Sequence, residues 1–246
     1  MNTAYICRRK DKNMNENYLR FNKLLAILSS RTKGGINISY KTESLLMKII
    51  GVILFFNKNF MENYTTTIGN TIYFPSRDRV EKASDDENLV ILSHEFVHIK
   101  DSERIGPLLF KIIYLSPQIF APIFGLLFFI LFNWYIGLIV FLVLLSPLPA
   151  YGRMRLEKRA YKTNLYSMTR ILKQSSQSEG FIMGRQARSY VWISKQFISS
   201  AYYFCWPISL DSEFSDTMMN INSGEFTKTD DIYMELADAY DELYKQ

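Results

Sequence analysis

The chain places its only two histidines four residues apart, in the run His94-Glu95-Phe96-Val97-His98. On a helix with 3.6 residues per turn, such residues stand one above the other, so both imidazoles can reach one tetrahedral ion. Glu95 lies about 100° around that helix, too far off the face to be a third ligand but able to reach a water on the metal. There it accepts the water proton and later hands it to a leaving amine. The spacing predicts a zinc site.

A zinc site of this kind needs a third protein ligand and one open position. Without a third histidine, the ligand must be Asp, Glu or, less favourably, Cys. The HExxHxxGxxH extension is excluded, because Asp101 and Arg104 occupy the positions of its glycine and last histidine. Asp101 also lies too close along the same helix to close a tetrahedron.

Glu157 is the best candidate for the third ligand. It lies on a second expected helix, on which small Ala160 would allow a close approach to the first. The alternative is that Glu157 only pairs with Lys158, Arg159 or another neighbouring cation on a solvated face.

Local signals place these residues in a mainly α fold with a small β-hairpin (α+β). Ser84-Asp-Asp-Glu87 is a capping box that starts the histidine helix, and Gly106-Pro107 ends it. The β-prone runs 64–68 and 71–75 flank a Gly-Asn turn and predict the hairpin. Further helices are expected over 15–30, 45–56, 153–172, 185–205 and 229–244, with breaks at Gly180 and Gly184.

The charge is segregated along the chain. All 53 charged residues (29 basic and 24 acidic) lie outside the stretch 112–152, which is 41 residues long. One helix of that length would span roughly 60 Å, twice the ~30 Å hydrocarbon thickness, and would separate Glu157 from His94. We therefore expect a membrane hairpin with passes over 112–132 and 135–149. The alternatives are a re-entrant hairpin and a hairpin buried in a soluble fold.

This division predicts three segments, 1–111, 112–152 and 153–246, of which the first and third form one catalytic domain. Cations flank the hairpin on both sides, so the positive-inside rule predicts that the zinc site and both termini are cytoplasmic. These cations are Lys100, Arg104 and Lys111 before it and Arg153, Arg155, Lys158, Arg159 and Lys162 after it.

Composition excludes other classes of protein. Cys7 and Cys205 are the only cysteines and form no CxxC pair, which disfavours a disulfide-stapled secreted module. Residues 1–33 are basic and residues 211–246 acidic, but no aromatic-interleaved basic motif occurs, so no nucleic-acid partner is expected. We expect two solvated faces that attract each other.

An HExxH motif, a membrane hairpin and a later helical glutamate together resemble the gluzincin metallopeptidases. The likeness is to the integral-membrane kind represented by the CAAX prenyl protease and its bacterial heat-shock counterpart, and it covers about residues 65–164. It implies a zincin-like core, Zn²⁺ held by His94, His98 and Glu157, and Glu95 as general base. It also implies that one strand of the 64–75 hairpin is an edge that binds an extended peptide or protein substrate. The Glu-x-x-Ala-Tyr pattern is also similar to small proteins of large bacteriophages.

The sequence departs from this family in three places. Tyr161 stands where members carry an acid that orients a zinc histidine, and Lys100 where an uncharged residue is usual. The histidine that stabilises the oxyanion is missing, so Tyr161, Arg153 or another Tyr or Arg must serve, or activity is weak. The leading hypothesis is a membrane zinc endopeptidase. The alternatives are a catalytically inactive zincin-like structural or interaction protein of a membrane or virion, and an adaptor without metal.

Overall fold

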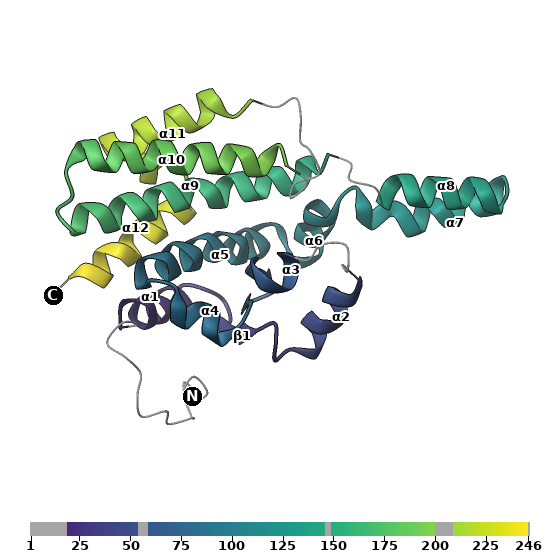
Figure 1. Ribbon diagram of the computed structural model, residues 1–246, viewed down its shortest axis with the longest axis horizontal. Coiled ribbons are helices and arrows are strands. Elements are labelled where there is room, and N and C mark those ends of the chain that lie inside the picture. The colour runs from purple at the N-terminus through teal and green to yellow at the C-terminus, as the bar shows by residue number, and fades with distance from the viewer. Residues whose placement is uncertain (1–18, 54–58, 146–148, 200–208, 246) are drawn as a thin grey trace.

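The chain folds mostly into helices around one small sheet, as expected for a mainly α fold with a minor β part. The computed structural model describes residues 19–53, 59–145, 149–199 and 209–245. Figure 1 shows a body of packed helices from which the pair α7–α8 projects. The elements are α1 (Leu19–Ser30), β1 (Asn37–Tyr40), α2 (Leu45–Ile53), α3 (Asn59–Glu62), β2 (Thr66–Ile68), β3 (Thr71–Phe74), α4 (Arg77–Lys82), α5 (Asp85–Ile105), α6 (Pro107–Leu115), η2 (Gln118–Phe120), α7 (Ala121–Leu131), α8 (Trp134–Leu145), α9 (Tyr151–Gln174), α10 (Glu179–Phe197), α11 (Asp211–Ser223), η4 (Phe226–Thr229) and α12 (Asp231–Tyr244).

The sheet has three strands in the order β1-β3-β2. The predicted hairpin is confirmed, since β2 and β3 pair antiparallel with Thr67 opposite Ile72 and Gly69 in the turn at φ +60. Strand β1 was not predicted, and it pairs parallel with β3 through Ile38 opposite Ile72. Strand β3 is therefore central, and β2 is an edge of the sheet.

Helix α5 carries the two histidines and begins and ends where the sequence predicts. The Ser84 hydroxyl accepts a hydrogen bond from the Glu87 amide at 3.1 Å, and Gly106 ends the helix at φ +91. The reciprocal half of the expected capping box is not found in the described residues, because the Glu87 carboxylate accepts from Arg79 at 2.5 Å. Phe96 and Val97 are fully buried in the core.

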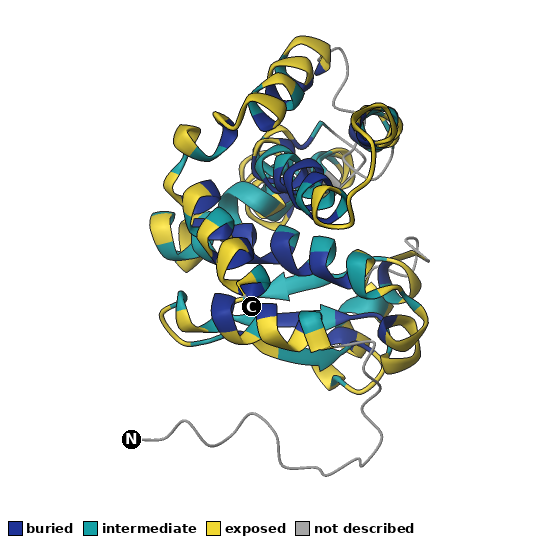
Figure 2. Ribbon diagram, turned by 90° about the vertical axis from the view of Figure 1, so that its left-hand side faces the viewer, coloured by how far each residue is buried: buried dark blue, intermediate teal, exposed yellow. Residues whose placement is uncertain are grey.

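Helix α9 lies against α5 and completes the centre of the body. Ala160 is fully buried at this contact, together with Leu165 of α9 and with Leu236 and Tyr240 of α12. Figure 2 shows buried residues on the sides where the helices face one another and exposed residues on their outer sides. Helices from the first and third segments thus share one hydrophobic core.

The basic and acidic ends of the chain meet in the described structure, where α1 packs beside α12. Arg31 forms an ion pair with Glu242 at 3.1 Å, and the Lys23 ammonium donates to the Leu243 carbonyl at 2.7 Å. The expected attraction between the two faces is present here. The expected helix start at 15 lies outside the described residues, as does the end of the 45–56 helix.

The C-terminal half differs from expectation. Helix α10 runs through Gly180 and Gly184, which were predicted to break it. Gly180 lies in the first turn of α10, and Gly184 costs about 1 kcal/mol in the helix interior, but burial of the Ile182 and Gln186 side chains holds the helix together. The break lies instead before Ser178, whose hydroxyl caps α10. The helix ends at Phe197, the rest of the expected 185–205 helix falls partly on undescribed residues, and α11 was not predicted.

The apolar stretch forms a helical hairpin, α7–α8, as expected, but its tip is at Phe132-Asn133, one residue before the gap left between the expected passes. Its first pass is not one helix, however. Helix α6 ends at Leu115, and its axis makes an angle of 97° with that of residues 118–131. Pro117 lies at this break and accounts for it, because a proline disrupts a continuing helix. Among the described residues no single helix is long and apolar enough to cross a bilayer, although this bent pair passes by length and composition together.

The hairpin has small residues inside and large apolar residues outside. A Cβ atom on Gly137 would lie 2.6 Å from the Gly125 backbone oxygen, so α7 and α8 touch through their backbones. Large apolar side chains point away from this contact and are exposed, among them Ile123, Leu126, Ile130, Leu131, Leu138, Ile139 and Leu142. The hairpin is therefore not buried inside a soluble fold, which was one alternative.

Candidate metal centre

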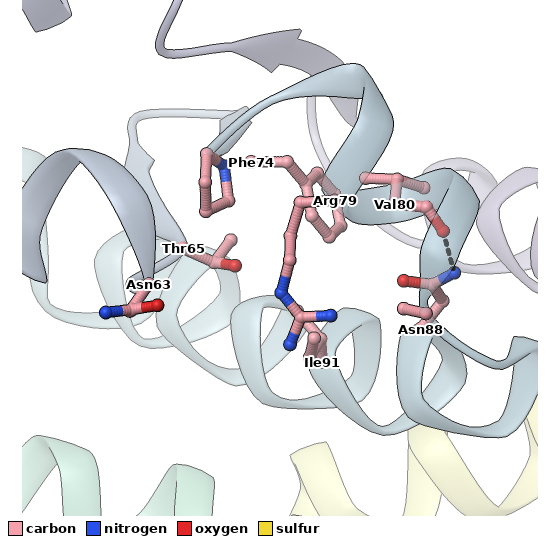
Figure 3. A pocket seen from close by; sticks show the side chains of 9 residues that line it. Asn63, Thr65, Phe74, Arg79, Val80, Asn88 and Ile91 are labelled. Atoms are coloured by element: carbon pink, nitrogen blue, oxygen red, sulfur yellow. Dashed lines mark hydrogen bonds between the residues drawn. The ribbon is translucent and has the colours of Figure 1, made fainter.

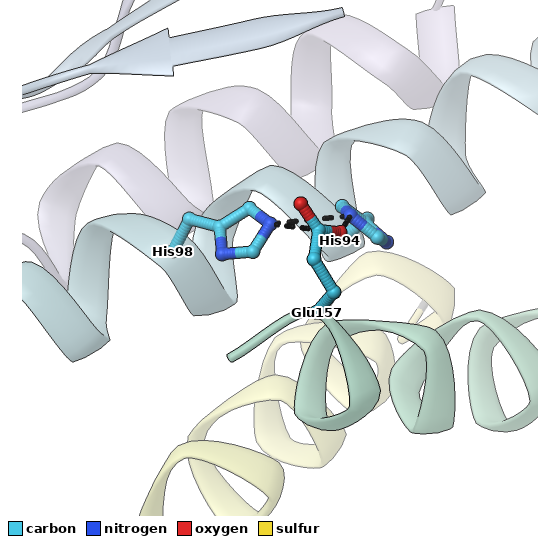
Figure 4. A group of neighbouring side chains, drawn as sticks. All are labelled: His94, His98 and Glu157. Carbon is cyan, nitrogen blue, oxygen red and sulfur yellow. Dashed lines mark hydrogen bonds and ion pairs between the residues drawn. The ribbon is translucent and has the colours of Figure 1, made fainter. Parts of the chain in front are cut away.

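Three predicted ligands converge between α5 and α9. Figure 4 shows His94 and His98 of α5 facing Glu157 of α9. Glu157 Oε2 lies 3.2 Å from His94 Nε2 and 3.6 Å from His98 Nε2, and the two Nε2 atoms are 3.2 Å apart. Asp101 is not in this group and pairs with Arg159 at 3.0 Å.

The spacing of these atoms fits a tetrahedral ion. Ligands about 2.0–2.1 Å from a tetrahedral zinc lie about 3.3 Å from one another. One ligand atom from each residue falls within a group no wider than 4.8 Å. Two imidazoles and one carboxylate also form a donor set that zinc accepts, with a fourth position left open. The residues therefore fit this metal.

The site is buried and electrostatically coupled. Glu157 is 4% exposed and His98 5%, so the solvated-face alternative for Glu157 is wrong. Burial alone would raise the pKa of Glu157. The charge on His98 and hydrogen bonds from both histidines outweigh this effect and lower the pKa to well below its usual value. Burial lowers the pKa of His98, but the Glu157 carboxylate outweighs this and raises it. The surroundings of Glu157 therefore favour an anionic carboxylate.

Asn164 orients one of the histidines. Its side-chain oxygen lies 3.2 Å from His94 Nδ1. A proton on Nδ1 held by this oxygen would leave the Nε2 lone pair available to a metal ion. The resemblance gives this orienting role to an acid at the position of Tyr161. Sequence reasoning missed Asn164, although it stands seven residues after Glu157, two turns along one face of α9.

Tyr161 lies beside the site as part of its wall. Its ring packs edge-on against the His94 ring at 4.9 Å and against Phe197 at 5.6 Å and Trp192 at 5.9 Å. Tyr161 is 8% exposed, whereas Trp192 is 54% exposed. An oxyanion role for Tyr161 stays a prediction.

Tyr114 is a site residue that sequence reasoning assigned to the membrane insert. Its hydroxyl donates to Glu157 Oε1 at 2.5 Å, and its ring lies edge-on to His98 at 6.0 Å. Arg153 lies over the Tyr114 ring at 5.0 Å, and its Nε is 4.0 Å from the same Oε1. The oxygen of Glu157 that faces away from the histidines thus has its own partners.

Glu95 lies on the side of α5 that faces the sheet. It is buried, and its Oε2 accepts a hydrogen bond from the Thr67 hydroxyl of β2 at 2.7 Å. It is not among the three grouped ligands, in agreement with the helical geometry. Lys100 points elsewhere and pairs with Glu235 of α12 at 2.8 Å, which explains a charge at this position.

A small pocket lies near the start of β2, one turn of α5 before Glu95. Ile91 of its lining is four residues before Glu95 and shares a face of α5 with it, and Thr65 directly precedes β2. Figure 3 shows the Arg79 side chain between Thr65 and Asn88 in this pocket. The lining residues are Asn63, Thr65, Phe74, Pro75, Arg79, Val80, Ala83, Asn88 and Ile91.

Comparisons with protein-family models, curated proteins and solved structures find no match to this chain. Similarity therefore assigns no family. What the chain does is inferred from the chemistry of the site.

Proposed function

We propose that the chain is a membrane-associated zinc endopeptidase with a zincin-like core. The observation that carries the proposal is the group formed by His94, His98 and Glu157, together with Glu95, which follows His94 on α5 and binds the edge strand through Thr67. An ion ligand set, a general base and a peptide-binding edge then lie side by side. These are the three parts that metal-assisted peptide hydrolysis needs.

Each residue has a distinct task in this reaction. A bound zinc ion would supply a Lewis acid for the scissile carbonyl and lower the pKa of a water to about 7. Glu95 would act as general base toward the water that attacks the carbonyl carbon, and would return the proton to the amine nitrogen as the C–N bond breaks. Asn164 keeps His94 in the tautomer that binds through Nε2.

The peptide lies along the outer edge of β2. One side of this strand pairs with β3, and no further strand of the described structure pairs with its other side, where a peptide could add one. Thr67 connects the peptide-binding edge with the proposed general base, because it lies in β2 and its hydroxyl binds Glu95. A substrate side chain two residues from the scissile bond would then lie near the pocket between Thr65 and Ile91.

The hairpin α7–α8 enters the lipid. Its outward side is apolar and its helix contact is built on Gly125 and Gly137, the small-residue packing typical of helices in membranes. Helix α2 adds exposed apolar side chains at the end of the body from which the hairpin projects (Figure 1). These are Leu45, Leu46, Ile49, Val52 and Ile53. So large an exposed apolar surface needs a nonaqueous partner.

A cytoplasmic location of the site and both termini remains part of the proposal. Most of the flanking cations that predicted it are paired with acids of the body, including Lys158 with Glu213 at 2.5 Å. Lys111 and Arg155 are exposed near the hairpin and are the cations that would meet anionic headgroups.

Metal content and a base-deficient variant test the proposed function together. Purified protein is expected to hold about one zinc per chain. Glu95→Gln should keep that zinc and lose cleavage of a peptide library, while Glu87→Gln on the same helix should keep both. Metal-free protein, or undiminished cleavage by Glu95→Gln, would contradict the proposal.

The second candidate is a zincin-like structural or interaction protein without turnover. It is favoured by the histidine content, since both histidines belong to the ligand group and none is left to stabilise an oxyanion. Normal zinc content combined with no cleavage by the wild type would support this alternative.

A further inference from the structure

The two ends of the hairpin meet next to the metal group. Helix α6 leads into the hairpin, and α9 begins directly after it. A Cβ atom added to Gly152 of α9 would collide with the backbone oxygen of Ile113 of α6. Only glycine permits this approach, which sets Tyr114 and Arg153, the next residue of each helix, beside one another.

Tyr114 and Arg153 act on the same oxygen of Glu157. The tyrosine hydroxyl donates to Oε1 at 2.5 Å, and the guanidinium, stacked on the tyrosine ring, approaches Oε1 to 4.0 Å. Oε2 faces both histidines. The carboxylate is thus held by one oxygen while the other points into the ligand group.

We propose, in an inference that rests on the proposed function, that Ile113, Tyr114, Gly152 and Arg153 form a clamp that fixes Glu157 for binding metal through one oxygen. Tyr114 is the positioning residue of this clamp. The partners of a ligating side chain set its orientation, and their removal costs metal affinity even though they touch no metal.

The clamp is tested by zinc affinity in the full chain, measured by competition with a chromophoric chelator. Tyr114→Phe removes one hydroxyl and keeps the ring, and it should weaken zinc binding roughly 10- to 100-fold. Tyr135→Phe, at the exposed tip of the hairpin, is the matched control and should bind zinc as the wild type does. The visible spectrum of the Co²⁺-loaded protein should also change in Tyr114→Phe, because the carboxylate is free to rotate.

A second variant keeps the test decisive if Tyr114→Phe fails to fold. Gly152→Ala retains every donor but forces α9 away from α6, so it too should weaken zinc binding. In the double variant the two losses should not add, since both act through one hydroxyl. If either single variant folds and binds zinc with the wild-type affinity, the clamp is overturned and the proposed function is unaffected. A wild type that binds no zinc overturns both.

Discussion

The Thr67 hydroxyl donates a hydrogen bond of 2.7 Å to the buried carboxylate of Glu95, and this bond joins the edge strand to the proposed general base. Thr67→Val keeps the shape of the side chain and removes the donor. A hydrogen bond to a charged group contributes about 1.5–3 kcal/mol, so kcat should fall roughly 10- to 100-fold if the bond holds Glu95 in place. Zinc content should not change, because Glu95 is not a ligand.

Thr66→Val is the matched control for this prediction. Thr66 is the neighbouring residue of β2, and its side chain points to the other face of the sheet. It should retain the wild-type kcat. Equal rates in wild type and Thr67→Val would show that the bond to Glu95 has no part in turnover.

The ion pair between His98 and Glu157 predicts an unusual pH dependence of stability in metal-free protein. The raised pKa of His98 gives stability that is complete below the usual 6.5 and is lost as pH rises through the folded value. The depressed pKa of Glu157 gives stability that is present above the usual 4.5 and is lost as pH falls through the folded value. Glu157→Gln should therefore lower the unfolding free energy most between about pH 4.5 and pH 6.5, and the loss should shrink at higher pH.

Glu213→Gln serves as the comparison in the same denaturant titrations with chelator. Glu213 pairs with Lys158 at 2.5 Å and with Lys162 at 2.6 Å, and neither partner is a histidine. Its effect should stay level between about pH 5 and pH 8. A Glu157→Gln effect that is equally level would mean that His98 carries no charge beside Glu157.

Local signals predicted much of this fold. The caps of α5, the β2–β3 turn and the face shared by His94 and His98 all depend on residues within a few positions of each other. Glu157 was also predicted, because excluding other ligand types left a helical acid after the insert. Such inferences need only the period of a helix or a strand.

Longer-range features were missed for a physical reason. Strand β1 has four residues and exists through parallel pairing with β3, more than 30 positions later. Tyr114 enters the site because α6 turns away from the hairpin at Pro117 and packs near Gly152, which no periodicity encodes. Asn164 depends on how α9 crosses α5. Helix crossings and bends are set by packing across the whole core.

Bound zinc is expected to stabilise the fold in addition to taking part in the proposed reaction. Binding to the native state alone adds about 2.7 kcal/mol when free zinc is about 100 times Kd, which raises Tm by roughly 5–10 °C in a domain of this size. His98→Ala and Glu157→Ala should both abolish this rise, since each removes a ligand. Calorimetry with and without zinc measures it, and a full rise in either variant would exclude that residue as a ligand.

The outward face of the hairpin gives the last prediction. Leu126 and Ile130 are 60% and 69% exposed and lie one turn apart on α7. Placing an acid at such a position within hydrocarbon costs about 2.5–3.5 kcal/mol, so a Leu126→Glu, Ile130→Glu variant should lose more than tenfold of its partitioning into anionic lipid vesicles. Met183→Glu, Met219→Glu adds the same charge at exposed sites on the body and should leave partitioning nearly unchanged. Zinc content should be equal in both variants, because none of these residues belongs to the metal site. Undiminished vesicle binding by the hairpin variant would assign the membrane contact to another surface.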